Sequence, residues 1–398
     1  MANTTEIVIA SAARTPIGRF LGGLSTLSAP DLGGIAIKEA VKRAGLTSND
    51  ICGVIMGHVC PAGLGQAPAR QAQIKSGLSP EIPALTVNKV CGSGLIAVVL
   101  SAQQIKAGDA EIMVAGGQES MSNVPYYLHQ LRNGNKMGDV KLVDGMIYDG
   151  IWCVFENVHM GILGEFTAER SGITREMQDE WAFYSHRKAV DAIKAGKFKT
   201  EIVPVVIPQK KGDPIVIDTD EGPRAETTME SLAKLRPAFK KENGTITAGN
   251  ASSINDGGAA LVIMSKAVAD KKGIKPLARI TAYATGSVEP KMLFYAPVKA
   301  VQRVMEKLDV DINYFDLIEV NEAFSSQVLA DAKELGMDPN KVNVHGGAVA
   351  LGHPIGASGA RILITLLHAL KDRGLKKGLA GICLGGGEAV ALAVEMML

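Results

Sequence analysis

One order of small residues, helix and strand occurs twice in this chain, and it constrains the fold more than any other feature. The first copy begins with Cys-Gly-Ser-Gly at residues 91–94, continues as an apolar helical stretch and ends as a strand closing on Gly-Gly at 116–117. The second begins with Gly-Ala-Ser-Gly at 356–359 and ends as a strand closing on Gly-Gly-Gly at 385–387. The same order of parts at similar spacing indicates two related halves packed together.

Short apolar runs alternate with helical periodicity through the N-terminal part of the chain. Residues 6–10 and 51–57 predict buried strands, whereas residues 28–45 carry apolar side chains at helical spacing. A helix over 97–107 and a strand over 111–115 follow. This alternation predicts an α/β fold with mostly parallel strand pairing.

Composition limits the classes of protein to which the chain can belong. Its 398 residues suffice for two or three compact units, and 46% hydrophobic with 21% charged residues exclude a disordered chain. Because 42 basic residues balance 41 acidic ones, the net charge is +1 and a nucleic-acid partner is not expected. No run of 18 uncharged apolar residues occurs, so we expect no membrane partner either.

The cysteines and the first residues of the chain indicate a compartment. The five cysteines are an odd number and include no Cys-x-x-Cys pair, which argues against a disulfide framework. The first residues lack both the apolar core of a secretory signal and the arginines of a transit peptide. We therefore expect a reducing, cytoplasmic location.

The region between the two halves has a different character. Roughly residues 120–250 break the alternation with many turn residues and with a charged helix over 174–195. Long excursions of this kind often carry substrate contacts. We expect this region to be an insertion that covers a site.

Several common catalytic signatures are absent. The chain has no P-loop motif, no Gly-x-Gly-x-x-Gly after its first strand, no His-Glu-x-x-His and no Gly-x-Ser-x-Gly. Nucleotide hydrolysis through a P-loop, zinc-protease chemistry and serine hydrolysis are therefore not expected.

Cys91 is the strongest candidate for a reactive residue. It follows an extended apolar run at 84–87 and precedes two glycines and a helix. A thiol at a helix N-terminus lies near the positive end of the helix dipole, which favours the thiolate. The alternative is a small buried cysteine with no chemical role.

Three further residues lie in loops that apolar periodicity does not explain. His353 stands between Gly352 and a proline, where an imidazole could take the proton of Cys91, although a single histidine is usually structural or exposed. Cys383 lies at a strand end, and by the internal repeat it falls near the same end of the second half as the neighbourhood of Cys91 does in the first. Asn321 follows the apolar strand 317–320, at the strand end where α/β folds place their sites.

Together these motifs resemble the thiolase family, and the resemblance runs nearly end to end. The stretches that carry it are Arg14–Gly18, Asn88–Gly94, Gly116–Ser122, Asn321–Phe324, Gly352–Pro354 and Cys383–Gly387. The resemblance implies an α/β fold of two similar five-layered αβαβα halves with an inserted loop domain. The implied division is an N-terminal half at 1–123 completed by about 254–275, a loop domain at 124–253 that covers the active site and binds coenzyme A, and a C-terminal half at 276–398.

The resemblance also implies an activity and a role for each site residue. Short-chain members interconvert two acetyl-CoA with acetoacetyl-CoA and CoA by ping-pong Claisen chemistry. Cys91 would carry the acyl group as a thioester, His353 would activate it, and Cys383 would move the α-proton. Asn321 would hold a water that completes one oxyanion site with His353, and the backbone N–H groups of Cys91 and Gly385 would form the other. No metal or other cofactor is implied, because coenzyme A thioesters are the substrates.

Further positions match the family's coenzyme A contacts. They are Arg224, Ser231, Ala248, Ser252 and Phe324, together with the pair His159 and Met160 in the segment that closes the acyl pocket. For Met160, ordinary filling of the core is the alternative. The resemblance further implies a homo-oligomer, with a tetramer favoured over a dimer.

Several positions depart from the family pattern. His345 replaces an asparagine ahead of the His353 loop, and we favour a supporting role for it over a second imidazole in the site. Residues 292–297 are Met-Leu-Phe-Tyr-Ala-Pro where the family has Met-Gly-x-Gly-Pro, so acyl specificity stays open. The alternatives are a 3-ketoacyl-CoA thiolase of longer chains and, from another class, a non-catalytic CoA- or lipid-binding relative. A decarboxylating ketosynthase fits less well, because Asn321 and Cys383 occupy positions where that group uses other residues.

Overall fold

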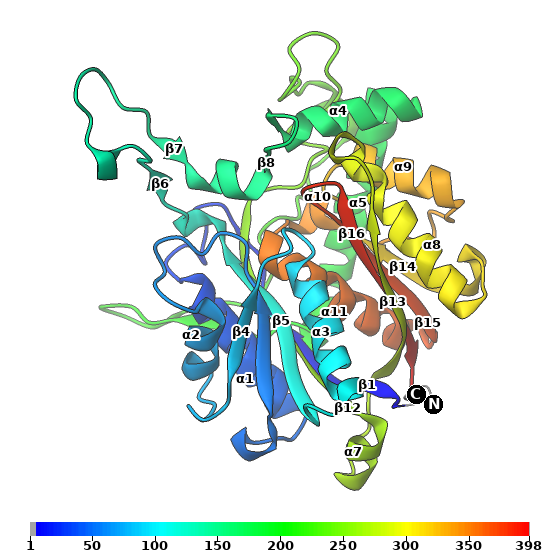
Figure 1. Ribbon diagram of the computed structural model, residues 1–398. Coiled ribbons are helices and arrows are strands. Elements are labelled where there is room, and N and C mark those ends of the chain that lie inside the picture. Colours follow the sequence, from blue (N-terminus) through cyan, green and yellow to red (C-terminus); the bar gives the residue numbers. More distant parts are fainter. Residues whose placement is uncertain (1–4, 398) are drawn as a thin grey trace.

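The computed structural model describes residues 5–397, and its central element is one mixed sheet (Figure 1). The strands run in the order β14-β15-β16-β13-β1-β12-β5-β3-β4, and β2 pairs with β12. Their bounds are β1 Ile7–Arg14, β2 Gly18–Arg19, β3 Gly53–Gly57, β4 Ala84–Val87, β5 Ile112–Ser120, β12 Asn255–Ser265, β13 Ala278–Ser287, β14 Leu317–Val320, β15 Lys377–Leu384 and β16 Glu388–Met396.

Helices cover both faces of this sheet and build much of the insertion. They are α1 Ala29–Arg43, α2 Pro68–Lys75, α3 Ser93–Ala107, α4 Met160–Ser171, α5 Arg175–Lys194, α6 Met229–Ala233, α7 Lys266–Lys271, α8 Ala296–Leu308, α9 Ser325–Leu335, α10 Ala348–Leu351 and α11 Ile355–Arg373. The insertion adds three small hairpins, β6 Tyr126–Tyr127 with β7 Val143–Asp144, β8 Trp152–Cys153 with β9 Val158–His159, and β10 Val205–Ile207 with β11 Ile215–Ile217. A π-helix, η4, spans Met146–Ile151, and a 3-10 helix, η6, spans Pro290–Tyr295.

The strand order repeats across the middle of the sheet. On one side the order is β4-β3-β5-β12-β1, and on the other β14-β15-β16-β13 follows the same plan, with a bridge between Ile318 and Val342 in the place of the outermost pair. The two sides meet where β1 pairs antiparallel with β13, at Val8 with Arg279 and at Ile9 with Ala278. This symmetry is what a duplicated chain produces.

The prediction of mostly parallel pairing is wrong. Only β3 with β4, β3 with β5, and β14 with β15 are parallel among the paired strands that the structure describes. A parallel pair requires a long crossover connection, whereas β15 and β16 are joined by the short glycine turn at 385–387 and must run antiparallel. The strand β12 likewise returns from the insertion in the opposite direction to β5 and β1.

Two helices, α3 and α11, form the interior helical layer of the molecule on one face of the sheet (Figure 1). α3 and α11 pack against each other and against the sheet, α1 covers β1, β5 and β12 on the other face, and α8 covers β13 and β16. Ile7 and Ile9 of β1 therefore belong to the core beneath α3 and α11, while Val8 and Ala10 belong to the core beneath α1. By length and composition alone, Val90–Ala107 is apolar enough to cross a membrane, but its helix α3 is an interior helix of this fold.

The first turns of α3 and α11 touch through glycine. A Cβ atom on Gly94 would lie 2.8 Å from the backbone nitrogen of Ala360, and one on Gly359 would lie 2.5 Å from the backbone nitrogen of Leu95. The two helices therefore approach each other backbone to backbone, at a distance that only glycine permits. The loops that precede them are brought together as a result.

A buried ion network fastens the insertion to β1. Arg14 at the end of β1 pairs through Nε with Glu201 at 2.6 Å and donates two hydrogen bonds to Asp220 at 2.7 and 2.8 Å. All three side chains are buried. Removing one partner of such a network leaves an uncompensated charge in the interior, which costs about 3–5 kcal/mol.

Replacing Gly94 with alanine should destabilise the protein by about 1–3 kcal/mol, because the new methyl group overpacks the contact between α3 and α11. The midpoint of urea unfolding measures this loss. Gly381→Ala is the matched control, since its Cβ would meet only Val301 at 3.9 Å. Equal midpoints for the two variants would contradict a glycine-dependent helix contact.

Candidate active site

A mostly apolar cavity of about 280 Å³ opens where the two halves and the insertion meet. The turn before α3, the end of β15, the loop before α11, and the segments η4, α4 and η6 all contribute to its wall. Eight of the residues singled out in the sequence line it: Cys91, His159, Met160, Ser252, Phe324, His353, Cys383 and Gly385.

Cys91 sits on a strained turn between β4 and α3. The residue before it, Val90, has a φ of 45°, which a β-branched side chain rarely adopts. The Ser93 hydroxyl stabilises the turn, because it accepts a hydrogen bond from the Lys89 N–H at 2.8 Å and donates one to the Val90 carbonyl at 2.6 Å. Strain of this kind costs about 1–3 kcal/mol and is concentrated at functional sites.

The surroundings of Cys91 favour its neutral thiol. Burial raises the pKa of Cys91 to about 12, and the backbone N–H groups of Cys91 and Gly385 lower it only in part. The expectation that a helix N-terminus would favour the thiolate is therefore wrong for the resting site. Desolvation outweighs these backbone N–H groups here, so the thiol needs a base in order to react.

His353 is held in one tautomer by a serine. Its Nδ1 lies 2.7 Å from Oγ of Ser358, and that hydroxyl donates its only proton to the Pro354 carbonyl at 2.9 Å. The serine oxygen must therefore accept from His353, which places the imidazole proton on Nδ1 and leaves Nε2 free to accept. Burial, with Arg361 adding to it, lowers the pKa of His353 to about 3, so the ring is neutral at physiological pH.

Asn321 lies beside His353 rather than in the cavity wall. Its N–H donates to the Gly381 carbonyl at 2.9 Å, which fixes it at the end of β14. Its Nδ2 is 3.5 Å from Nε2 of His353. Oδ1 of Asn321 is buried and accepts no hydrogen bond from the residues that the structure describes.

Cys383 approaches the same cavity from the second half of the chain. It is buried at the end of β15, in an apolar cluster that includes Leu293, Phe294 and Phe324. Burial raises the pKa of its thiol well above the usual value, and the neighbouring Cys91 raises it further. Two protonated thiols, one from each half, thus face one cavity together with a neutral imidazole.

Three of the residues matched to coenzyme A contacts stay outside this cavity. Arg224, Ser231 and Ala248 are exposed, and none of them lines it. The Ser231 hydroxyl caps α6 instead, because it accepts from the Thr228 N–H at 3.0 Å and donates to the Thr228 carbonyl at 2.8 Å. Of the positions matched to coenzyme A contacts, the structure therefore brings His159, Met160, Ser252 and Phe324 together in the cavity wall. The other three stay on the surface.

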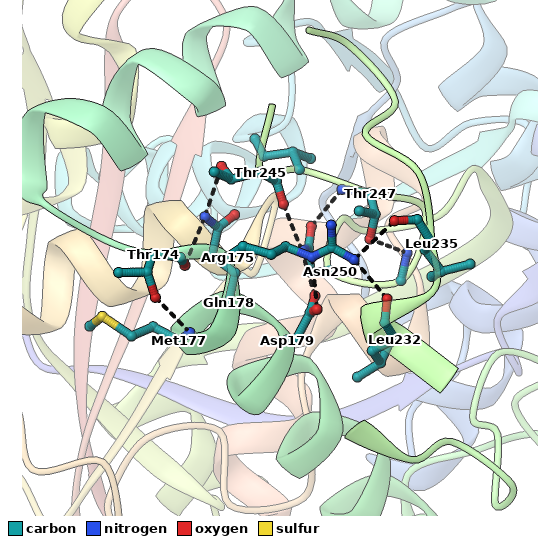
Figure 2. Close-up of polar contacts among 12 residues, drawn as sticks. Thr174, Arg175, Met177, Gln178, Asp179, Leu232, Leu235, Thr245, Thr247 and Asn250 are labelled. Atoms are coloured by element: carbon teal, nitrogen blue, oxygen red, sulfur yellow. Dashed lines mark hydrogen bonds and ion pairs between the residues drawn. The ribbon is translucent and has the colours of Figure 1, made fainter. Parts of the chain in front are cut away.

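A polar cluster holds the loop that carries Ser252 (Figure 2). Asn250 donates from Nδ2 to Asp179 of α5 at 2.8 Å, and Arg175 donates from Nε to the same carboxylate at 2.7 Å. The Asn250 carbonyl accepts from the N–H of Ser325 at the start of α9 at 2.9 Å. The loop is thus tied to the insertion and to the second half at once.

Comparison with known proteins covers nearly the whole chain. Residues 7–267 match the family model described as the thiolase N-terminal domain, and residues 274–396 match the one described as the thiolase C-terminal domain. The chain belongs to the thiolase family. An acetyl-CoA acetyltransferase of Cupriavidus necator is 56% identical over 391 residues, which cover 98% of this chain and 99% of that protein. Proteins of the same name from Pseudomonas aeruginosa and Escherichia coli are each 53% identical, with 98% of this chain and 99% of the relative covered.

Sequence reasoning missed two residues that shape the site of this thiolase. Ser358, which sets the tautomer of His353, is the serine of the second Gly-Ala-Ser-Gly stretch and could have been suspected from its spacing. Glu119 is fully buried, and its carboxylate accepts from the N–H groups of Val59 at 3.0 Å, Cys60 at 3.2 Å and Gly356 at 2.9 Å. It joins the loop after β3 to the start of α11, a connection that no local pattern reveals.

The departures from the family pattern have separate places in this thiolase. His345 is buried and meets Phe198 edge-on with ring centroids 5.9 Å apart, and it does not line the cavity. Leu293 and Phe294 do line it. The next aromatic, Tyr295, turns away, because its hydroxyl makes a hydrogen bond of 2.6 Å with Ser171.

Because the pKa of Cys91 is raised to about 12, its thiolate fraction should grow about tenfold with each pH unit across the neutral range. We expect alkylation of Cys91 by iodoacetamide to accelerate in this way from pH 7 to pH 9 without levelling off. Peptide mass spectrometry measures the rate at this one residue. A plateau near neutral pH would mean that an ion pair with His353 already exists in the resting protein.

Proposed function

We propose that this chain is an acetyl-CoA C-acetyltransferase, which cleaves acetoacetyl-CoA with CoA into two acetyl-CoA and catalyses the reverse condensation. The observation that carries the proposal is the convergence of Cys91, Cys383 and His353 on one apolar cavity, beside the N–H groups of Cys91 and Gly385. Relatives that are 50–56% identical over nearly their full length are named acetyl-CoA acetyltransferases, which supports it.

In the cleavage direction, the proton of the Cys91 thiol passes to Nε2 of His353 while the sulfur attacks the keto carbon of acetoacetyl-CoA. The bond between that carbon and the α-carbon then breaks. The protonated thiol of Cys383 gives its proton to the α-carbon, and acetyl-CoA leaves while an acetyl group remains on Cys91. The raised pKa of Cys383 suits this step, because the group starts as an acid.

In the second half-reaction, CoA gives its thiol proton to the Cys383 thiolate and its sulfur attacks the acetyl group. Cys91 leaves as a thiolate and takes back the proton that His353 holds, so every proton is accounted for. Condensation uses the same groups in reverse order. The covalent intermediate divides one difficult carbon–carbon step into two easier ones.

Negative charge develops at two oxygens during this sequence. We assign the oxygen of the group bound to Cys91 to the N–H groups of Cys91 and Gly385, which already face the sulfur. We assign the enolate oxygen to His353, protonated by then, and to a water held by Asn321. Donors placed in advance at such positions are each worth about 3–4 kcal/mol in comparable sites.

A homo-oligomer and a cytoplasmic location remain part of the proposal, with a tetramer favoured. Two surface features support self-association. The strand β4 is the last strand of the sheet, and its Leu85 is half exposed. The segment around β6 and β7 exposes Tyr126, Leu131, Met137 and Leu142.

Replacing Cys91 with alanine should abolish formation of the acetyl-enzyme, because no other group takes over the thioester bond. Intact-mass measurement after incubation with acetyl-CoA detects the acetyl group directly. Cys52→Ala, which alters an exposed cysteine, is the control and should acetylate normally. A folded Cys91→Ala variant with full thiolase activity would refute the proposed function.

Replacing Cys383 with serine should separate the two half-reactions. Acetyl transfer to Cys91 should persist at a reduced rate, because the CoA thiolate can leave without a proton from Cys383. Exchange of the α-protons of acetyl-CoA with deuterated water should stop, because a hydroxyl is a far weaker acid than a thiol and does not form the base that removes the α-proton. Nuclear magnetic resonance follows the exchange, and intact mass follows the transfer. Equal loss of both would show that the role of Cys383 is misassigned.

A further inference from the structure

The short helix η6 forms one wall of the catalytic cavity. It packs against α4, α9 and the end of β15, so it is enclosed on several sides by elements of the site. Two of its residues, Leu293 and Phe294, line the cavity, and each is only 2% exposed. Nothing in the proposed chemistry uses either side chain.

This wall shares the cavity with Cys91, on which an acyl group would be carried. The N–H of Gly385 faces the Cys91 sulfur, and a Cβ on Gly385 would lie 3.2 Å from the terminal methyl of Met160. Met160 in turn packs against the apolar cluster that contains Leu293 and Phe294. An acyl chain that extended from Cys91 past Met160 would therefore meet Leu293 and Phe294.

Aromatic contacts hold the Phe294 ring in place. It meets Phe324 edge-on with ring centroids 5.4 Å apart, and Phe324 meets Phe239 in the same way at 6.1 Å. Phe239 stacks on His159 with centroids 4.6 Å apart. Each ring contacts the next, so a movement of Phe294 would disturb Phe324 directly and Phe239 and His159 through it.

The space left for an acyl chain is small. The cavity holds about 280 Å³, whereas pockets for drug-sized ligands run from about 300 to 1,000 Å³. The same volume must also hold the end of the coenzyme A chain to which the acyl group is attached. Little room then remains beyond the first carbons of the acyl group.

We propose that Phe294 is a specificity-determining residue that closes the acyl end of the cavity and restricts the substrates to acetyl and acetoacetyl thioesters. The proposal rests on the function proposed above and adds a size limit to it. The ring excludes longer chains by occupying their path, and it takes no part in bond making.

Thiolysis of acetoacetyl-CoA and of 3-oxooctanoyl-CoA, measured as kcat/KM for each, tests the size limit. In the Phe294→Ala variant the ratio of C8 to C4 activity should rise at least about tenfold, since even one methylene in an apolar pocket is worth about 10–200-fold. Phe294→Leu should give a smaller rise, because it restores part of the volume. Tyr295→Phe is the matched control, as this neighbouring ring points to Ser171 and should leave the ratio unchanged.

The outcomes separate the two proposals. If the wild-type protein does not cleave acetoacetyl-CoA, the proposed function fails. If the wild-type protein cleaves it and folded Phe294 variants keep the wild-type ratio, only the size limit fails. Should Phe294→Ala lose its folded structure in thermal unfolding, Phe294→Leu decides, with intact-mass detection of octanoyl on Cys91 after incubation with octanoyl-CoA as the second measurement.

Discussion

The backbone contact between the first turns of α3 and α11 is the constraint on which the site of this thiolase depends. Gly94 and Gly359 carry no side chains, so the two helices meet more closely than any other residue would allow. The loop before one helix carries Cys91 and the loop before the other carries His353. Because both helices belong to the interior core, the position of each loop is set by packing that extends through both halves.

Burial determines how the groups in this cavity behave. It raises the pKa of both thiols and lowers the pKa of His353, so all three groups are neutral at rest. In the mechanism proposed above, charge appears only during the reaction, where the N–H groups of Cys91 and Gly385 stabilise it. The strained turn at Val90 and the Ser358 hydroxyl beside His353 fix the positions of Cys91 and of the imidazole before any substrate binds.

Local sequence patterns predicted the existence of the helices and strands around the site better than they predicted where these elements begin and end or how the strands pair. The strand at 317–320 agrees with β14, and the helix at 174–195 agrees with α5 within one residue at each end. α3 begins at Ser93, four residues before the predicted start, because glycine and serine give no apolar periodicity. Strand direction was wrong, since it depends on where each connection returns and not on the strand's own residues.

The sequence by itself indicated the α/β class and the duplication, and it singled out Cys91, His353 and Cys383 as candidate site residues, because short stretches of adjacent residues carry these signals. Only the tertiary structure decided the ionisation of those groups, the Nδ1 proton of His353, and the exclusion of Arg224, Ser231 and Ala248 from the cavity. It also decided that Phe294 faces the cavity and Tyr295 does not. The physical reason is that desolvation and packing act between segments far apart in the chain, which no local pattern records.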